Sequence, residues 1–379
     1  MAENTLFADG MEYLAVDLER INRETMKRQN SLNKEVRSME KKLVLRALGV
    51  FTLSLITINL ILIGSLWTAQ AAPAGKAKPE MTKLNIGLPV PAFSLLPTWV
   101  ADQKGFLKEE GITEVKILAF RGDADVIQAL AAGSVDINVA SLTGLVTTIT
   151  AGQKFKAYWA GYNMPIFEWY AQTKYKSIVE TKGGRYGVSK LGAMTDFLTR
   201  YALRKAGLDP DKDVNILQIG PDAQNLAALM SGQLDATILS IPFSYMAAEK
   251  GLVRLMSQKE QVSPDYPTHV VYAKEEFVAK NPNTIKAFLR ATGKAIEWIK
   301  AKPDEAAQLA SNQLKLNLEY CRKGIDAFRD GWFSDGRLPK DGMRVFWTIA
   351  VDAGDVKEPW PESKWLDPTF LKTQDQWRK

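Results

Sequence analysis

Two stretches, Leu130-Ala-Ala-Gly-Ser-Val-Asp136 and Leu229-Met-Ser-Gly-Gln-Leu-Asp235, share one layout, and their aspartates stand 99 positions apart. In each, an apolar helical segment ends at a glycine, whose positive φ closes a helix at low cost. An aspartate then leads into a short apolar strand. Because the spacing is too long for a solenoid repeat, it favours two similar α/β lobes. The alternative is a chance likeness of two helix ends.

Short apolar runs alternate with helical segments around these two stretches. This order predicts an α/β fold, in which sheets with parallel strands carry helices on their faces. From residue 275 to about residue 330 the signals are mainly helical, and five tryptophans after residue 330 suggest a tail held onto a lobe by aromatic contacts. The predicted strands are 84–88, 115–120, 137–140, 155–160, 186–188, 214–219, 237–239 and 269–273, and the predicted helices are 98–110, 123–132, 142–151, 195–205, 223–231 and 243–250.

Composition excludes several classes of protein. The chain has 379 residues, of which 46% are hydrophobic, and this is enough for a globular protein of two domains. The net charge of +6 comes from interspersed charges, so no nucleic-acid-binding stripe is expected. Cys321 and His269 are the single residues of their types. A single cysteine cannot form a disulfide within these 379 residues, and one cysteine with one histidine supplies too few ligands for a Cys/His zinc site. Imidazole catalysis would depend on His269 alone. We therefore expect that the protein is not an enzyme and that it binds no metal and no cofactor.

The amino-terminal part has the pattern of an export signal. A basic flank ending at Arg46, the apolar run Leu48–Trp67 and the small-residue site Ala69-Gln-Ala71 are the three parts of a secretory signal. An uncleaved anchor is the alternative, because about 20 apolar residues also span a bilayer. Residues 1–38, with charges of both signs, fit a signal poorly, and we hypothesise that Met39 is the true start. Residues 39–71 are then the signal or anchor helix, and the rest of the protein lies in the periplasm.

Several segments together resemble the solute-binding proteins of ABC importers, in particular those of the nitrate, sulfonate and taurine type, which are related to the binders of thiamine-pyrimidine precursors. The resemblance covers roughly residues 83–340. It departs from the pyrimidine-synthase branch, whose cysteine-rich motif and histidine chemistry are missing here, and this favours binding over catalysis. The segments that carry the resemblance are Leu84-Asn-Ile-Gly-Leu-Pro89, Lys104-Gly-Phe-Leu-Lys-Glu-Glu-Gly-Ile112, both Gly-x-[Val/Leu]-Asp stretches, Gly183-Gly-Arg-Tyr-Gly-Val188, Arg204-Lys-Ala-Gly-Leu-Asp-Pro210 and Ser240-Ile-Pro242.

The resemblance implies a two-lobed periplasmic-binding-protein fold of type II, with a hinge between the lobes and the ligand in the cleft. We expect residues 83–166 and 274–379 in the first lobe and residues 167–273 in the second. The implied partners are a small-molecule solute, an ABC permease and its ATPase, and the protein is expected to be a monomer. An exported enzyme and a membrane-tethered ligand sensor are the alternatives.

Ligands of open α/β sheets bind at the carboxyl ends of strands, near helix amino termini. In the first lobe this rule selects six residues. Phe93 would stack on the ligand or pack in the core, and Arg121 would clamp an anion or stay solvated. Ser141 and Thr143 would bind ligand oxygens, cap a helix, or do both. The residues selected are Phe93, Ser94, Arg121, Ser141, Thr143 and Tyr162.

In the second lobe the strongest candidate is the loop before residue 195, whose small residues let backbone amides approach a ligand. Glu168, near the first crossing between the lobes, would hold a cation or only pack in the hinge. An oxyanion and a flat nitrogenous molecule both remain open, and we favour a sulfonate, a nitrate-like ion or a related small nitrogen or sulfur compound. The residues selected are Glu168, Gly192, Ala193, Met194, Thr195, Asp222 and Pro242.

Overall fold

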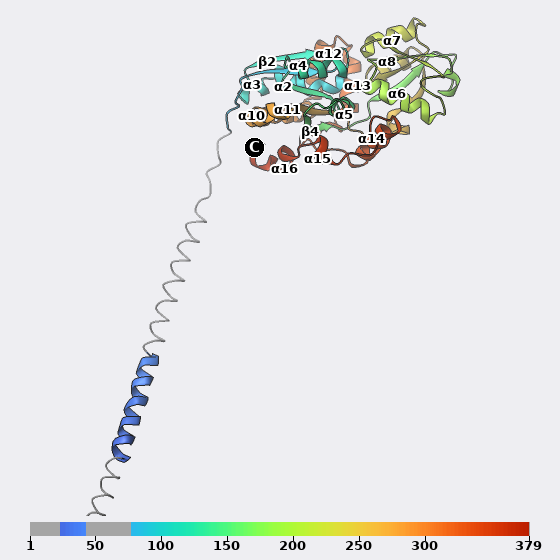
Figure 1. Cartoon of the computed structure of the whole chain (residues 1–379). Coiled ribbons are helices and arrows are strands. Elements are labelled where there is room, and N and C mark those ends of the chain that lie inside the picture. The colour runs from blue at the N-terminus through green and yellow to red at the C-terminus, as the bar shows by residue number, and fades with distance from the viewer. Residues whose placement is uncertain (1–22, 43–76, 379) are drawn as a thin grey trace, which may run out of the picture. The chain divides into compact units, whose positions relative to one another are not determined.

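The computed structural model describes residues 23–42 and 77–378 (Figure 1). Residues 23–42 form one exposed helix, which belongs to a separate unit of the chain. The apolar run of the predicted signal, most of residues 39–71 and the first part of the predicted extension 1–38 lie outside the described residues. Within the described ranges, no helix has both the length and the apolar character needed to cross a membrane.

The first sheet has the strand order β2-β1-β3-β10-β4. Lys83–Leu88 (β1) pairs in parallel with Glu114–Ala119 (β2) and with Ile137–Ser141 (β3). His269–Lys274 (β10) lies antiparallel between β3 and Phe155–Tyr162 (β4). We call the part of the protein built around this sheet the first lobe.

The second sheet repeats this topology with the order β7-β6-β8-β5-β9. Arg185–Val188 (β6) pairs in parallel with Asn215–Gln218 (β7) and Ala236–Ser240 (β8). Phe167–Ala171 (β5) lies antiparallel between β8 and Val253–Ser257 (β9). This part is the second lobe, and Figure 1 shows the two lobes next to each other.

The repeated stretches have the same role in both lobes. In the first, Asp136 accepts a hydrogen bond from the Asn85 N–H at 2.7 Å and returns one from its own N–H to the Asn85 carbonyl at 2.9 Å. In the second, Asp235 makes the same pair of bonds with Arg185, at 3.0 and 2.9 Å. The sequence repeat therefore reflects two lobes of one design, in which an aspartate fixes the register between neighbouring parallel strands.

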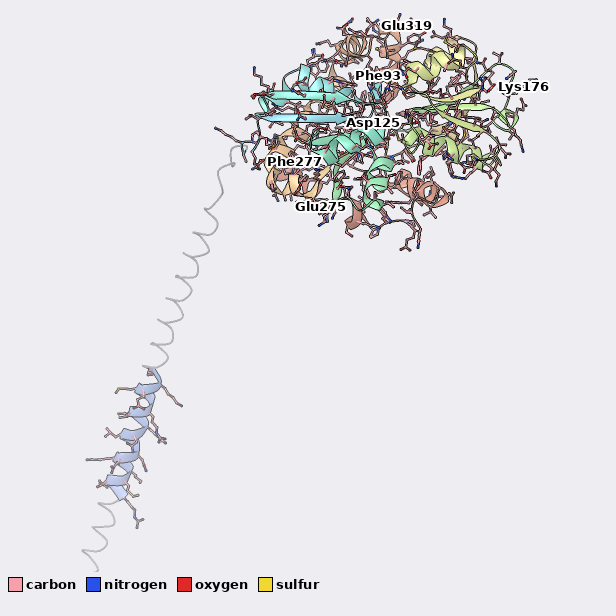
Figure 2. All side chains as sticks on the ribbon, turned by 45° about the horizontal axis from the view of Figure 1, so that its top comes forward. Phe93, Asp125, Lys176, Glu275, Phe277 and Glu319 are labelled. Atoms are coloured by element: carbon pink, nitrogen blue, oxygen red, sulfur yellow. The ribbon has the colours of Figure 1, made fainter. Side chains whose placement is uncertain are left out.

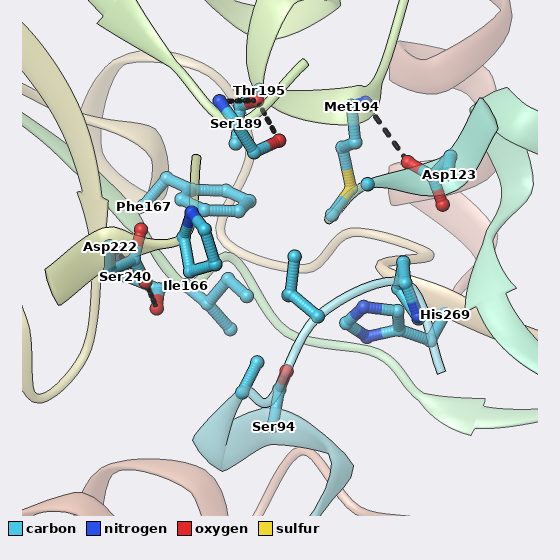
Figure 3. Close-up of a pocket in the computed structure, with 15 residues that line it drawn as sticks. Ser94, Asp123, Ile166, Phe167, Ser189, Met194, Thr195, Asp222, Ser240 and His269 are labelled. Carbon is cyan, nitrogen blue, oxygen red and sulfur yellow. Dashed lines mark hydrogen bonds between the residues drawn. The ribbon is translucent and has the colours of Figure 1, made fainter. Parts of the chain in front are cut away.

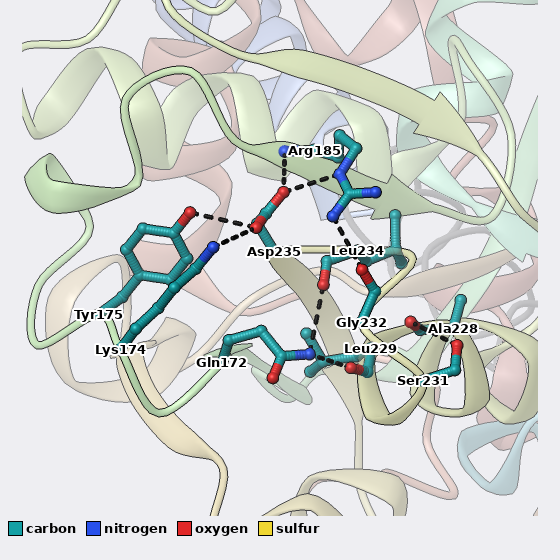
Figure 4. Close-up of polar contacts among 10 residues, drawn as sticks. All are labelled: Gln172, Lys174, Tyr175, Arg185, Ala228, Leu229, Ser231, Gly232, Leu234 and Asp235. Carbon is teal, nitrogen blue, oxygen red and sulfur yellow. Dashed lines mark hydrogen bonds and ion pairs between the residues drawn. The ribbon is translucent and has the colours of Figure 1, made fainter.

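The second copy of this aspartate has further partners (Figure 4). Asp235 also accepts hydrogen bonds from Arg185 Nε at 2.8 Å, Lys174 Nζ at 3.0 Å and the Tyr175 hydroxyl at 3.1 Å. Burial by itself raises the pKa of Asp235, but these bonds outweigh it and hold the pKa well below its usual range. The network ties the start of β8 to the segment that follows β5.

The predicted helices of both lobes occur within two residues of their expected ends, except the first. Residues 98–110 were expected to form one helix, but it starts earlier and breaks at Gly105, which adopts φ +78°. This part consists of Phe93–Leu95 (η1), Leu96–Gln103 (α2) and Phe106–Glu109 (α3). The other lobe helices are Asp123–Ala132 (α4), Leu142–Thr150 (α5), Val179–Thr181 (η2), Met194–Lys205 (α6), Asp222–Met230 (α7), Phe243–Glu249 (α8) and Gln258–Gln261 (α9).

One predicted boundary needs correction. The expected second lobe, residues 167–273, includes most of β10, but β10 pairs with β3 and β4 on its two sides and so completes the first sheet. The chain thus crosses back before residue 269. Beyond β10 the chain is helical, as expected, with Glu275–Lys280 (α10), Pro282–Ala301 (α11), Pro303–Leu314 (α12) and Leu318–Phe328 (α13).

The carboxyl-terminal segment lies along both lobes (Figure 1). Phe346 packs on Phe197 of α6 at a ring distance of 6.0 Å, and Trp377 packs on Trp159 of β4 at 6.3 Å. Between them Trp347 contacts Trp365 at 6.1 Å. The segment is held by aromatic contacts, as its tryptophans predict. Its helices are Lys340–Asp352 (α14), Glu362–Trp365 (α15), Thr369–Lys372 (α16) and Gln374–Trp377 (α17).

Candidate functional site

A cavity of about 40 Å³ lies between the lobes, where the parallel strands of both sheets end (Figure 3). The loops that follow β1 and β2 form one wall, and the loops that follow β6, β7 and β8 form the other. This is the position that the strand-end rule predicts. The lining residues are Pro89, Val90, Ala92, Ser94, Gly122, Asp123 and His269 of the first lobe, Ile166 of the crossing segment, and Phe167, Ser189, Met194, Thr195, Pro221, Asp222 and Ser240 of the second lobe.

Asp123 joins the two lobes. It is buried at the start of α4, and its Oδ1 accepts a hydrogen bond from the Ser141 N–H at 3.2 Å within the first lobe. Its Oδ2 accepts from the Met194 N–H, at the start of α6 in the second lobe, also at 3.2 Å. Burial raises the pKa of Asp123, and these hydrogen bonds oppose the shift. One carboxylate therefore satisfies backbone donors at the beginnings of two helices.

A second contact closes the lobes beside the cavity. Lys190 of the second lobe forms an ion pair with Asp125 of α4, which lies on the side of the first lobe that faces the second (Figure 2). Gly122 faces the same lysine, and a Cβ atom added at Gly122 would lie 2.8 Å from Lys190 Cβ. The structure is thus a closed arrangement in which a single extra methyl group at Gly122 would meet the opposite lobe.

Asp222 is the counterpart of Asp123 in the second lobe, 99 positions later. It begins α7, and its Oδ2 accepts hydrogen bonds from the Ser240 N–H at 3.3 Å and from the Ser240 hydroxyl. Burial raises the pKa of Asp222 to about 6, although the bonds from Ser240 oppose the shift. Unlike Asp123, it makes no hydrogen bond to the other lobe, and its Oδ1 has no partner among the described residues.

Two further polar atoms of the lining have no hydrogen-bond partner within the described part of the chain. They are Ser94 Oγ and His269 Nδ1, and both residues are only 3% exposed. Burial lowers the pKa of His269 to about 3, so its imidazole is neutral at physiological pH. Because buried polar atoms are normally paired, these two atoms indicate a place where a ligand supplies the missing partners.

Four of the residues selected from the sequence line the cavity: Ser94, Met194, Thr195 and Asp222. Thr195 Oγ1 also accepts a hydrogen bond from the Ser189 N–H at 3.0 Å, which shapes the loop before α6.

Three other residues selected in the second lobe, Gly192, Ala193 and Pro242, do not line the cavity. Ala193 is buried directly before α6, and the Gly192 N–H is already bound to Asp196 at 2.8 Å. Pro242 lies before α8, and its carbonyl accepts a hydrogen bond from the Tyr245 N–H at 3.1 Å.

The other first-lobe selections have local structural contacts. Phe93 is buried against Phe328, with ring centres 5.4 Å apart, and Ser141 caps α5 by accepting a bond from the Gly144 N–H at 2.9 Å. Thr143 is buried in the first turn of α5, and Tyr162 packs edge-on against His269 at 6.1 Å. Arg121 is exposed and does not line the cavity.

Glu168 lies at a different place. It accepts a hydrogen bond from Arg254 at 3.0 Å and one from the Tyr170 hydroxyl at 3.3 Å. It lines an adjoining, wider cavity of about 420 Å³ on the crossing segments, which shares Ile166 and Phe167 with the first cavity.

Sequence reasoning did not select Asp123, Ser189, Ser240 or His269 as ligand contacts, although all four line the cavity. A signal for two of them exists in the repeat. The 99-position offset that aligns Asp136 with Asp235 also aligns Asp123 with Asp222, and Ser141 with Ser240.

Comparison with known proteins agrees with this architecture. Residues 92–306 match the model of the NMT1/THI5-like family. The Bacillus subtilis protein YtlA, named as a binding protein, is 27% identical over 251 residues, which are 62% of this chain and 72% of YtlA. A solved structure from Bordetella bronchiseptica is 26% identical with a TM-score of 0.70, and the match covers 80% of this chain and 100% of that one.

Two more distant structures share the fold alone. The periplasmic nitrate-binding protein NrtA of Synechocystis is 18% identical with a TM-score of 0.65, over 80% of this chain and 89% of NrtA. The desulfurization enzyme DszB is 15% identical with a TM-score of 0.59, over 78% of this chain and all of DszB. By its family match and its architecture, the chain belongs to the NMT1/THI5-like family and has the two-lobed α/β fold of periplasmic binding proteins, as its sequence predicts.

Proposed function

We propose that the protein is the solute-binding component of an ABC importer, which captures a small solute between its lobes and delivers it to a membrane permease. The observation that carries this proposal is the closed cavity, which both lobes line and in which Ser94 Oγ and His269 Nδ1 lack partners. A solute seated there touches both lobes at once. YtlA is named as a binding protein and NrtA as a nitrate-binding one, which supports the same kind of activity here.

Capture follows from the geometry. The chain passes between the sheets twice, once between β4 and β5 and once between β9 and β10. A hinge at these crossings lets the lobes separate, and a solute that contacts both walls shifts the population towards the closed form. The bond from Met194 to Asp123 and the ion pair of Lys190 with Asp125 then add to closure. We take the two lobes as residues 83–166 with 269–379, and residues 167–268.

Export to the periplasm completes the proposal. Residues 39–71 supply the signal, or an anchor to the inner membrane if they are not cleaved, and the partners are an ABC permease and its ATPase. The receptor acts as a monomer, because one chain contains both walls of the cavity.

An exported enzyme is the main alternative, since DszB shares the fold. The carboxyl groups in the cavity accept backbone hydrogen bonds from Ser141, Met194 and Ser240, which gives them a structural reason to be there. A receptor returns its ligand unchanged, whereas an enzyme converts it.

A thermal-shift screen of the unliganded protein tests the proposal. The panel contains taurine, alkanesulfonates, nitrate, bicarbonate, dicarboxylates, pyrimidines, guanidine compounds and polyamines. A ligand at 100 times its Kd adds about 2.7 kcal/mol to the stability of the native state, which is readily seen as a rise in Tm. We expect one class of compound to raise Tm and to be recovered unchanged. Conversion of that compound on incubation would contradict the proposal.

A further inference from the structure

The charges that line the cavity are of one sign. Its ionisable residues are Asp123, Asp222 and His269, and burial keeps the histidine neutral. No lysine or arginine of the described residues lines it. Lys190, on the neighbouring loop, is paired with Asp125. An anion entering this cavity would meet two carboxyl groups and no cation that compensates them.

Helix amino termini are the usual seats for anions, and three helices begin at this cavity. At α6 a carboxyl group of the protein already holds the first N–H group, and α4 and α7 begin with carboxyl residues that make no capping bond to their own helices. Asp123 begins α4 and also accepts the Met194 N–H at the start of α6, while Asp222 begins α7. An oxyanion would have to displace these groups or bind beside them.

The unpaired atoms of the lining favour a ligand with N–H groups. Asp222 Oδ1 only accepts hydrogen bonds when ionised, and a neutral imidazole offers one acceptor nitrogen. The unpaired Ser94 Oγ and His269 Nδ1 are nine-tenths buried or more, and Figure 3 shows Ser94, His269 and Asp222 around one central space. Asp222 is partly exposed, and it lines the same cavity as these two buried atoms that lack a partner among the described residues.

The size of the cavity adds a limit. In the same measure one water molecule needs about 10–15 Å³, so 40 Å³ in this closed form holds a ligand of only a few heavy atoms. A bulky ring system would force the lobes apart and separate Met194 from Asp123.

Resting on the proposed function, we propose that the solute is a small nitrogen compound with an ammonium or amidinium group, whose N–H donors bind Asp222 Oδ1, with Ser94 Oγ and His269 as its other polar contacts. Of the two ligand classes that the sequence leaves open, this selects the nitrogenous one. It places the selecting carboxylate at Asp222, not at Glu168, which is paired with Arg254.

Ions of matched shape and opposite charge test the inference. Guanidinium and nitrate are both planar ions of four heavy atoms, and acetamidinium and acetate form a second such pair. Each is titrated calorimetrically at millimolar concentration, pH 8, into the unliganded full-length protein. We expect guanidinium or acetamidinium to bind and nitrate and acetate not to bind.

Variants locate the binding group. Asp222→Asn should weaken binding of the cation at least tenfold, and Ser94→Ala should weaken it less. Asp136→Asn is the matched control, because Asp136 also binds a backbone N–H but lies outside the cavity, and it should leave the affinity unchanged. Melting curves confirm that each variant is folded.

The contrary outcomes are distinct. Binding of nitrate or acetate without the cations would overturn the inference and leave the receptor function standing, as would a hit with a sulfonate in the wider screen. The inference would also be overturned if none of the four ions binds. Cation binding that Asp222→Asn does not affect would show that the ligand is held elsewhere.

Discussion

The Met194 N–H of the second lobe donates a hydrogen bond at 3.2 Å to Asp123 of the first lobe, and this bond crosses the space between the lobes. Asp222, at the same position of the repeat, makes no such crossing bond to any residue that the structure describes. The duplicated fold therefore places two equivalent carboxyl groups at one cavity, and their surroundings differ. Asp123 joins the lobes, whereas Asp222 is the residue that we propose binds the solute.

Asp123→Ala should favour the open form. It removes the acceptor for the N–H groups of Met194 and Ser141, and we expect a loss of about 1–2 kcal/mol in the free energy of unfolding. Small-angle X-ray scattering of the protein with its solute bound should show a larger radius of gyration for the variant than for the native protein. In Asp136→Ala, which loses a bond within one lobe, the radius should not change. Equal radii for Asp123→Ala and the native protein would contradict the role given to Asp123.

Gly122→Ala should hinder closure by steric contact. The added Cβ would lie 2.8 Å from Lys190 Cβ, the near end of that side chain, which cannot move without the backbone of the second lobe. We expect weaker solute binding together with a larger radius of gyration. Gly133→Ala is the control: its φ of +77° makes alanine unfavourable by about 1 kcal/mol, but open space surrounds the new methyl group. A change in radius for both variants alike would refute the steric explanation.

Asp222→Asn should stabilise the protein at neutral pH. The pKa of Asp222, about 6 in the folded state, lies above its ordinary value of 3.8. Ionisation above pH 6 therefore costs the folded state more than the unfolded state, and removing the charge should add about 1–3 kcal/mol to the free energy of unfolding at pH 8. The gain should shrink as the pH falls through 6 and vanish near pH 4. Denaturant unfolding at these pH values measures it, and a gain independent of pH would be the contrary result.

Cation binding should weaken in acid. One pH unit below the pKa of Asp222, at pH 5, most of this carboxyl is protonated, and affinity should fall about tenfold from its value at pH 8. Asp123, whose pKa is also raised, changes in the same direction, and His269 stays neutral because its pKa is about 3. Calorimetry at the two pH values checks this, and affinity that rises in acid would indicate an anionic solute.

Asp235→Ala should be more destabilising than Asp136→Ala, although the two residues are equivalent in the repeat. Asp235 accepts bonds from Arg185, Lys174 and Tyr175 side chains in addition to the backbone bond that both aspartates share. We expect losses of about 2–3 kcal/mol for Asp235→Ala and about 1–2 kcal/mol for Asp136→Ala in denaturant unfolding. Equal losses would show that the extra bonds, which are partly exposed, contribute little.

Local patterns predicted most of the fold. Alternating apolar runs, glycines at helix ends and the 99-position repeat can be recognised from residues close in sequence. They predicted most of the helices and strands and the two-lobe design. Residues close in sequence do not show which distant segments pair with each other. The strand at His269–Lys274 looks the same whichever sheet it joins. Sequence analysis did not predict two strands of the second sheet, Phe167–Ala171 and the edge strand Val253–Ser257.

The site was predicted in part for a similar reason. The strand-end rule finds the loops, and four of the residues that it selected, Ser94, Met194, Thr195 and Asp222, line the cavity; that they bind a ligand stays a prediction. It does not give the direction of a side chain. Phe93 adjoins Ser94 but packs on Phe328, a partner 235 positions away that only the folded chain brings near.

The central claim is that this protein holds a solute between its lobes without changing it. Mass spectrometry of the small molecule retained by the natively purified protein, before and after prolonged incubation, tests this most directly. The account predicts one small solute per chain, of the same mass at both times. A solute that is converted to another mass, or a protein that retains none even from a concentrated extract of small molecules, would contradict it.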